Sequence, residues 1–170
     1  MMLLLPKKFD ENEIFILIIG FFLTLLVLIL PRKFSLTETV LIFLFNFYLA
    51  AVVDHIIAGP PLNLYDIMDD PKFEIMDLFM YLFVYTSSGY LFIYGYTYFS
   101  RPWYKSTAYV LAVALFTVGL EWIAHNFLVF KYFEWSIYFS MIAYVILFTV
   151  NIYFFKLVRH LLRNAHVPGQ

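Results

Sequence analysis

The sequence predicts an all-α integral membrane bundle of five transmembrane helices. Of its 170 residues, 64% are hydrophobic and only 14% are charged, whereas soluble domains are about 45 to 50% apolar and about 25% charged. The mean hydropathy is +0.83. The hydrophobic share is about 109 positions, enough for about five spans of about 20 residues each. The composition therefore excludes an ordinary soluble enzyme and predicts a single membrane domain over residues 1–170.

Capping boxes and helix breakers delimit the first two spans. Asp10 and Ser35 each stand three residues ahead of a glutamate, the spacing in which two side chains satisfy each other's open backbone donors at a helix start. The first apolar run ends at Pro31, and the second ends where Gly59 is followed by two prolines. Both spans are therefore bounded on either side.

The remaining three spans are separated by prolines and short polar turns. Asp70 before a proline is typical of a helix start, Arg101 and the following proline separate the third span from the fourth, and a short turn at Lys131 precedes the fifth. The five predicted spans are residues 14–30, 37–58, 74–99, 104–130 and 135–157.

Lysine and arginine counts predict the orientation. Alternate connections place four lysines on the N-terminal side and seven basic residues on the other. Because cytoplasmic loops carry the excess of Lys and Arg, the N-terminus is expected outside and the C-terminus in the cytoplasm. The richer set is Arg32, Lys33, Arg101, Lys105, Lys156, Arg159 and Arg163.

Four ionisable residues fall inside predicted spans and form the main candidate site. Asp54 and His55 lie in the second span, and Glu121 and His125 in the fourth. Charged groups at membrane depth usually face the bundle interior and often mark a functional site. Both spans run in the same direction, so all four residues are expected in the outer half of the membrane.

Other polar residues at helical spacing extend this site into an expected outward-facing pocket. Asn46 precedes Asp54 by two turns, and a matching stripe in the fourth span predicts that the two helices face each other. Further polar side chains come from the third, fourth and fifth spans. The expected pocket-lining residues are Asn46, Asp77, Tyr81, Tyr85, Asn126 and Ser140.

Three interpretations of the four-residue cluster are open. Asp54, His55, Glu121 and His125 could bind a divalent metal, as carboxylates and imidazoles do in helix bundles, and could activate water against a lipid. They could instead handle ions or protons. In the third interpretation they only hydrogen-bond one another and join helices.

Two further groups have simpler explanations. The acidic residues Asp66, Asp69 and Asp70 precede a helix, where they complement its positive N-terminal dipole; a Mg²⁺ or Ca²⁺ site is the alternative. Aromatic residues at span ends are expected in the interfacial belt. That second group comprises Trp103, Tyr104, Tyr132 and Trp135.

The stretch EIMDLFMYLFVYTSSGYLFIY from Glu74 to Tyr94, with the DH-x-x-x-GPP end of the second span, resembles small uncharacterised multi-pass membrane proteins of endospore-forming, Bacillus-like bacteria. The resemblance implies a bacterial cell-membrane location, and it carries no established activity over to this chain. We therefore expect an accessory or interaction subunit with an outward-facing polar pocket. The alternative is a metal-dependent enzyme acting on a lipid, or an ion- or proton-handling protein.

The charge balance and the lack of cysteine narrow the expected partners. A formal net charge of −1 gives no basic surface for nucleic acid. Without cysteine there is no disulfide, thiolate metal site or cysteine nucleophile. The expected partners are the lipid bilayer and either a second copy or a larger membrane protein, because five helices are few for a transporter of inverted repeats.

Overall fold

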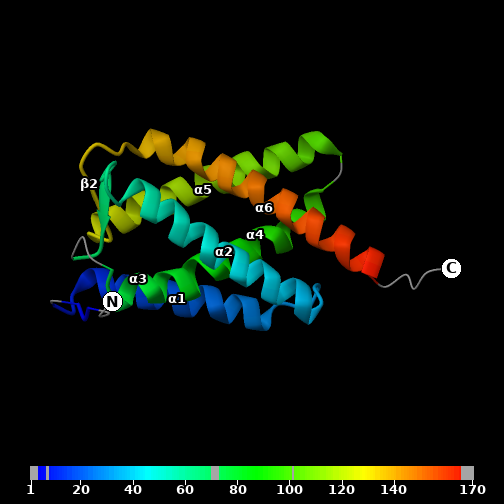
Figure 1. Cartoon of the computed structure of the whole chain (residues 1–170), viewed down its shortest axis with the longest axis horizontal. Coiled ribbons are helices and arrows are strands. Elements are labelled where there is room, and N and C mark those ends of the chain that lie inside the picture. The colour runs from blue at the N-terminus through cyan, green and yellow to red at the C-terminus, as the bar shows by residue number, and fades with distance from the viewer. Residues whose placement is uncertain (1–3, 7, 70–72, 101, 166–170) are drawn as a thin grey trace.

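The computed structural model is an elongated bundle of helices, and it describes residues 4–6, 8–69, 73–100 and 102–165 (Figure 1). Five helical segments are long and apolar enough to cross a membrane, which confirms the predicted helical class. The helices, in chain order, are α1 (Glu11–Ile29), α2 (Leu36–Ile57), α3 (Ile75–Phe79), the π-helix η1 (Met80–Tyr85), α4 (Thr86–Phe99), α5 (Trp103–Asn126) and α6 (Ile137–Ala165).

Both predicted capping boxes are present. Asp10 and Glu13 cap the start of α1 reciprocally, and Ser35 and Glu38 do the same for α2. In each case the glutamate carboxylate accepts the backbone N–H of the cap residue at 2.8 Å. The starts of the first two spans are thus determined locally. The predicted cap at Asp70 lies outside the described residues.

Two span ends differ from the prediction. Helix α5 ends at Asn126 rather than at residue 130, because Leu128 has a left-handed φ of 58° and the next residues form a strand. Helix α6 continues to Ala165, well beyond residue 157. Its basic residues therefore lie on a helix instead of in a tail.

A small sheet closes one end of the bundle. Strands β1 (Tyr65–Ile67) and β2 (Phe130–Tyr132) pair antiparallel, in the register Tyr65 with Tyr132, Asp66 with Lys131 and Ile67 with Phe130. Figure 1 places both strands at the end where the described chain begins, opposite the C-terminus. We call this the sheet end and the opposite end, where α6 finishes, the basic end.

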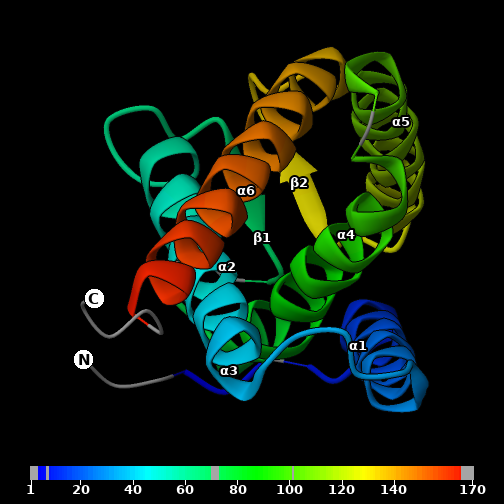
Figure 2. The same cartoon turned by 90° about the vertical axis from the view of Figure 1, so that its right-hand side faces the viewer.

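The third span is the central one. Half of its most apolar window is buried inside the protein, against 17 to 22% for the other four spans. It contacts α1 and α2 on one side and α5 and α6 on the other, an arrangement visible down the bundle in Figure 2. Helices α2 and α5 do not pack directly face to face as expected; each packs mainly on α4 or α6.

The central span changes its winding where it approaches the sheet end. Residues Met80–Tyr85 form a π-helix between two α-helical stretches. Such wide turns occur mostly as single-turn bulges and frequently at functional sites. Here the π-helix carries Tyr81 and Tyr85, whose rings stack with centroids 5.8 Å apart.

Close contacts between helices depend on small residues. A side chain at Gly89 of α4 would overlap the Asn46 amide of α2, and one at Gly20 of α1 would come within 2.7 Å of the Phe79 ring. Asn46 donates to the Ile42 carbonyl at 2.9 Å within its own helix. It therefore packs as part of the α2–α4 contact.

Candidate functional site: two buried carboxylates held by paired tyrosines

Asp54 is buried in the last turn of α2, with only 7% of its surface exposed. The hydroxyl of Tyr65, from β1, donates a hydrogen bond to Asp54 Oδ1 at 2.5 Å. The hydroxyl of Tyr81, from the π-helix, faces the same carboxylate. Asp54 is thus approached by phenol groups from two different elements.

Glu121 occupies the equivalent depth on α5 and is also buried. Its Oε1 accepts hydrogen bonds from Ser140 Oγ at 2.6 Å and from the Tyr132 hydroxyl. Ser140 in turn accepts the indole N–H of Trp135 at 2.9 Å. Tyr144 of α6 is a further hydroxyl partner of Glu121. Elements α5, β2 and α6 therefore meet at this carboxylate.

The sheet register links the two carboxylates. Tyr65 and Tyr132 are directly paired across β1 and β2, and one donates to Asp54 while the other donates to Glu121. We call this pair the tyrosine clamp. Burial, and next the carboxylate beside each phenol, raises the pKa of Tyr65 and of Tyr132 above the usual 10.0. Both phenols therefore remain hydrogen-bond donors at physiological pH.

His125 positions one half of the clamp. Its Nδ1 lies 2.7 Å from the Phe130 carbonyl oxygen, and since a carbonyl only accepts, Nδ1 carries the proton. The imidazole stacks flat on the Tyr132 ring, with centroids 4.5 Å apart and planes 4° from parallel. His125 thus fixes the ring that donates to Glu121, whereas His55 is exposed on α2.

A third carboxylate belongs to the same region. Asp77, at the start of α3, is 4% exposed and interacts electrostatically with Asp54. Its Oδ2 accepts the Glu74 backbone N–H at 2.8 Å. Asp54 also interacts electrostatically with Glu121, and Tyr85 with Asp54. We refer to Asp54, Asp77 and Glu121 as the carboxylate cluster.

The carboxylate cluster has no basic partner within the part of the chain that the structure describes. The ion pairs found there join Lys131 to Asp69 at 3.6 Å and Arg159 to Glu38 at 2.9 Å, away from the cluster. Asp54 Oδ2 and Asp77 Oδ1 are buried and have no described donor within hydrogen-bond distance, although the Tyr81 hydroxyl faces the Asp54 carboxylate. Buried acceptors without donors are uncommon in proteins, and each calls for an explanation.

The structure does not bring the four predicted metal ligands together. Asp54 and Glu121 face the interior, His125 is engaged with Phe130, and His55 faces outward. Among the described residues no three His, Asp or Glu side chains are arranged to hold a metal ion. The geometry therefore gives no support to a metal bound by this set of four.

The six residues expected around the pocket separate into two groups. Tyr81, Ser140 and Asp77 belong to the hydrogen-bonded region described above, and Tyr85 stacks beside it. The two asparagines do not. Asn46 packs against Gly89, and the exposed Asn126 donates to the Trp122 carbonyl in its own helix at 2.9 Å.

Sequence reasoning missed several residues of the site. Tyr132 and Trp135 were expected in the interfacial belt, but both take part in the hydrogen bonds around Glu121. Tyr65 and Tyr144 were not singled out. Asp69 accepts from Asn12 at 3.2 Å as well as pairing with Lys131. The spacing of Tyr132 eleven residues after Glu121, matching that of Tyr65 after Asp54, was a usable signal.

These observations define the class: a multi-pass membrane protein of five spans whose buried carboxylates are held by a short sheet at one end. Comparison of the chain with protein family models, with curated proteins and with solved structures finds no match. What the carboxylate cluster does must be argued from its own chemistry.

Proposed function

We propose that the chain is a small protein of the bacterial cell membrane that binds an ammonium-type cation at the carboxylate cluster, either alone or as an accessory subunit of a larger membrane partner. The excess of Lys and Arg at the basic end supports an orientation with that end in the cytoplasm. The cluster then faces the outside.

The observation that carries this proposal is the pair of buried acceptors without donors. Asp54 Oδ2 and Asp77 Oδ1 lack a hydrogen-bond donor among the described residues, and no described basic side chain lies within ion-pair distance of either group. Burying a carboxylate without a partner costs free energy. A bound cation would supply N–H donors and positive charge to these carboxylates and offset that cost.

Aromatic rings around the cluster favour an ammonium over a bare metal ion. The rings of Tyr81 and Tyr85 stack beside Asp54, and the tyrosine clamp contributes the rings of Tyr65 and Tyr132. A cation over an aromatic face gains about 0.5 to 2 kcal/mol. A metal ion would instead need several oxygen ligands converging on one point, and no described group of three supplies them.

The π-helix supports the same proposal. It places Tyr81 against Asp54 while the α-helical residues before it hold Asp77 at the start of the span. Wide turns are frequent at functional sites, and this one lies at the cluster.

The test is ligand-dependent stability in detergent micelles. Ammonium or methylammonium at 100 times its dissociation constant should raise the free energy of unfolding of the wild-type protein by about 2.7 kcal/mol. Asp54→Asn should lose this effect, because it removes the charge but keeps the acceptor for Tyr65. Asp69→Asn, which changes a carboxylate outside the cluster, should retain it.

Two results would refute the proposal. One is that neither ammonium nor methylammonium stabilises the wild-type protein more than sodium chloride of the same ionic strength does. The other is an Asp54→Asn variant that is stabilised as much as the wild type. Magnesium and calcium chloride serve as further arms, and stabilisation by these ions alone would favour the metal interpretation instead.

A further inference from the structure

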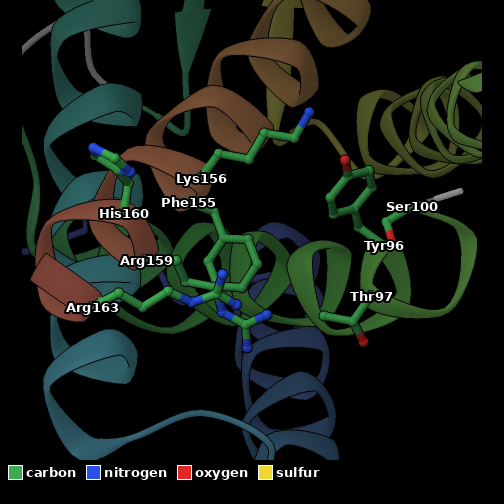
Figure 3. A pocket seen from close by; sticks show the side chains of 8 residues that line it. All are labelled: Tyr96, Thr97, Ser100, Phe155, Lys156, Arg159, His160 and Arg163. Carbon is green, nitrogen blue, oxygen red and sulfur yellow. The ribbon is translucent and has the colours of Figure 1, made fainter.

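A pocket lined by basic and hydroxyl side chains lies at the basic end of the bundle. It has a volume of about 440 Å³ and is formed by the last turns of α4 and α6. In Figure 3, Arg159 and Arg163 extend from α6 toward Thr97 of α4, and Lys156 extends toward Tyr96, near Ser100 at the end of α4. One wall therefore offers cationic groups and the other offers hydroxyls.

The positive charge of the α6 wall is concentrated on one face. Arg159, His160 and Arg163 lie three, four and seven residues after Lys156, which places all four on one face of the helix, and α6 contains no acidic residue. Like charges at this spacing destabilise a helix. Glu38 already pairs with Arg159, and an anion bound among the other basic groups would offset the remaining repulsion.

One of the arginines is held in place for such an anion. Arg159 donates from Nε to Glu38 Oε1 at 2.9 Å, and its guanidinium lies over the Phe155 ring at 4.5 Å. This bond engages Nε and leaves both amino groups of the guanidinium to bind a ligand. Arginine presents paired N–H donors that match phosphate oxygens.

The hydroxyl wall carries a further cation. Lys33, from the connection between α1 and α2, donates to Thr97 Oγ1 at 3.1 Å. Its ammonium also lies 3.0 Å from the centroid of the Tyr98 ring. Lys33 therefore adds positive charge beside the pocket from a third part of the chain. Complementing the negative C-terminal dipole of α6 would account for the basic residues of α6 itself. It would not account for the hydroxyls of the α4 wall or for Lys33.

The position of the pocket along α6 indicates which part of a membrane it would meet. Helix α6 has 29 residues and is about 43 Å long at about 1.5 Å per residue, whereas the hydrocarbon core is about 30 Å thick. Counting from Ile137 at the sheet end, the helix leaves the hydrocarbon near Lys156. The residues from Lys156 to Arg163 then lie in the headgroup layer.

We propose that this pocket binds the phosphate group of an anionic phospholipid. Arg159 and Arg163 contact the phosphate oxygens, Lys156 and Lys33 supply further positive charge, and Ser100 can donate to the headgroup. The acyl chains remain in the bilayer beside α4 and α6, where Phe99 and Leu157 are exposed. This site is separate from the carboxylate cluster at the sheet end, so the two proposals can fail independently.

The experiment measures lipid retained by the purified full-length protein, using native mass spectrometry from detergent micelles. Phosphatidylglycerol should be retained and phosphatidylcholine should not. The double variant Lys156→Gln/Arg163→Gln should weaken phosphatidylglycerol binding by more than about tenfold, since each basic residue near an anionic lipid contributes about fivefold. Arg32→Gln, which removes an exposed positive charge from the same end but outside the pocket, should weaken binding less than the double variant does.

Inorganic phosphate distinguishes a lipid from a free phosphate as the ligand. It should not displace phosphatidylglycerol, because it lacks the acyl chains that hold a lipid beside the pocket. Displacement at equal concentration would overturn the lipid assignment. Equal retention of phosphatidylcholine by the wild-type protein would overturn it too, as would an equal loss of binding in Arg32→Gln and the double variant.

Discussion

At the scale of single residues, Tyr65 and Tyr132 explain how the two buried carboxylates are held. Each phenol comes from a strand, and each donates to a carboxylate on a different helix. Among the described residues, no side chain of α2 donates to Asp54 and none of α5 donates to Glu121. The sheet therefore supplies one donor to each carboxylate, and Ser140 of α6 supplies another to Glu121.

Removing one clamp hydroxyl should destabilise the protein. Tyr65→Phe leaves Asp54 Oδ1 without its donor, and an unsatisfied buried acceptor costs about 1 to 3 kcal/mol. The loss is measured as the free energy of denaturant unfolding in micelles. Tyr138→Phe is the matched control, because Tyr138 is 82% exposed. Equal effects of the two substitutions would show that the Tyr65 hydroxyl contributes nothing to the free energy of unfolding.

The clamp also predicts a fall in stability at alkaline pH. The pKa values of Tyr65 and Tyr132 are raised in the folded protein by burial and by the neighbouring carboxylates. Above pH of about 10, unfolded tyrosine loses its proton while the folded clamp keeps it. The folded state then binds more protons, so stability decreases as the pH rises. The double variant Tyr65→Phe/Tyr132→Phe should show a shallower decrease between pH 9 and 11 in unfolding titrations; an unchanged slope would contradict this.

At the scale of elements, close packing of α2 on α4 depends on one glycine. A Cβ added at Gly89 would overlap the Asn46 side chain, whereas Gly119 of α5 has open space around it. Gly89→Ala should lower the free energy of unfolding by about 1 to 3 kcal/mol through overpacking. Gly119→Ala should leave it unchanged or raise it by up to about 1 kcal/mol through helix propensity. Unfolding of both variants is compared, and a harmless Gly89→Ala would argue against the α2–α4 contact.

The helix boundaries and strands also show which elements could be predicted from the sequence. The caps at Asp10 and Ser35 could be predicted because they are local, with each partner three residues away. The end of α5 could not, since the residues after Asn126 are as apolar as those before it. Two strands of three residues each are too short to show alternation.

For the candidate site, the buried carboxylates could be predicted from residue type, but their hydrogen-bond partners could not. Asp54 and Glu121 stood out because charge is costly inside a membrane. Tyr132 did not, because a tyrosine at a span end looks the same whether it faces lipid headgroups or donates to a buried carboxylate. Its role depends on the pairing of β1 with β2, which joins segments more than sixty residues apart. The π-helix likewise leaves no recognisable pattern in the sequence.

At the scale of the whole molecule, the two ends differ in charge and in chemistry. The sheet end holds the carboxylate cluster, and the basic end holds the cationic pocket. The proposed orientation puts the first outside the cell and the second in the cytoplasm. Each end would then meet the ligand that its charge favours.

The orientation can be tested with single cysteines, because the chain contains none. Leu62→Cys lies at the sheet end and Asn164→Cys at the basic end, both at exposed positions. A membrane-impermeant maleimide should label Leu62→Cys in intact cells and Asn164→Cys only after the membrane is permeabilised. The reverse labelling pattern would place the carboxylate cluster on the cytoplasmic side.

The most direct test of the central claim is isothermal titration of the purified protein with methylammonium. If Asp54 and Asp77 form a cation site, the titration should show about one bound cation per chain in the wild type and none in Asp54→Asn, with Asp69→Asn behaving as the wild type. Absence of binding to the wild type, or equal binding by Asp54→Asn, would contradict the claim and leave the tyrosine clamp as a device that joins helices.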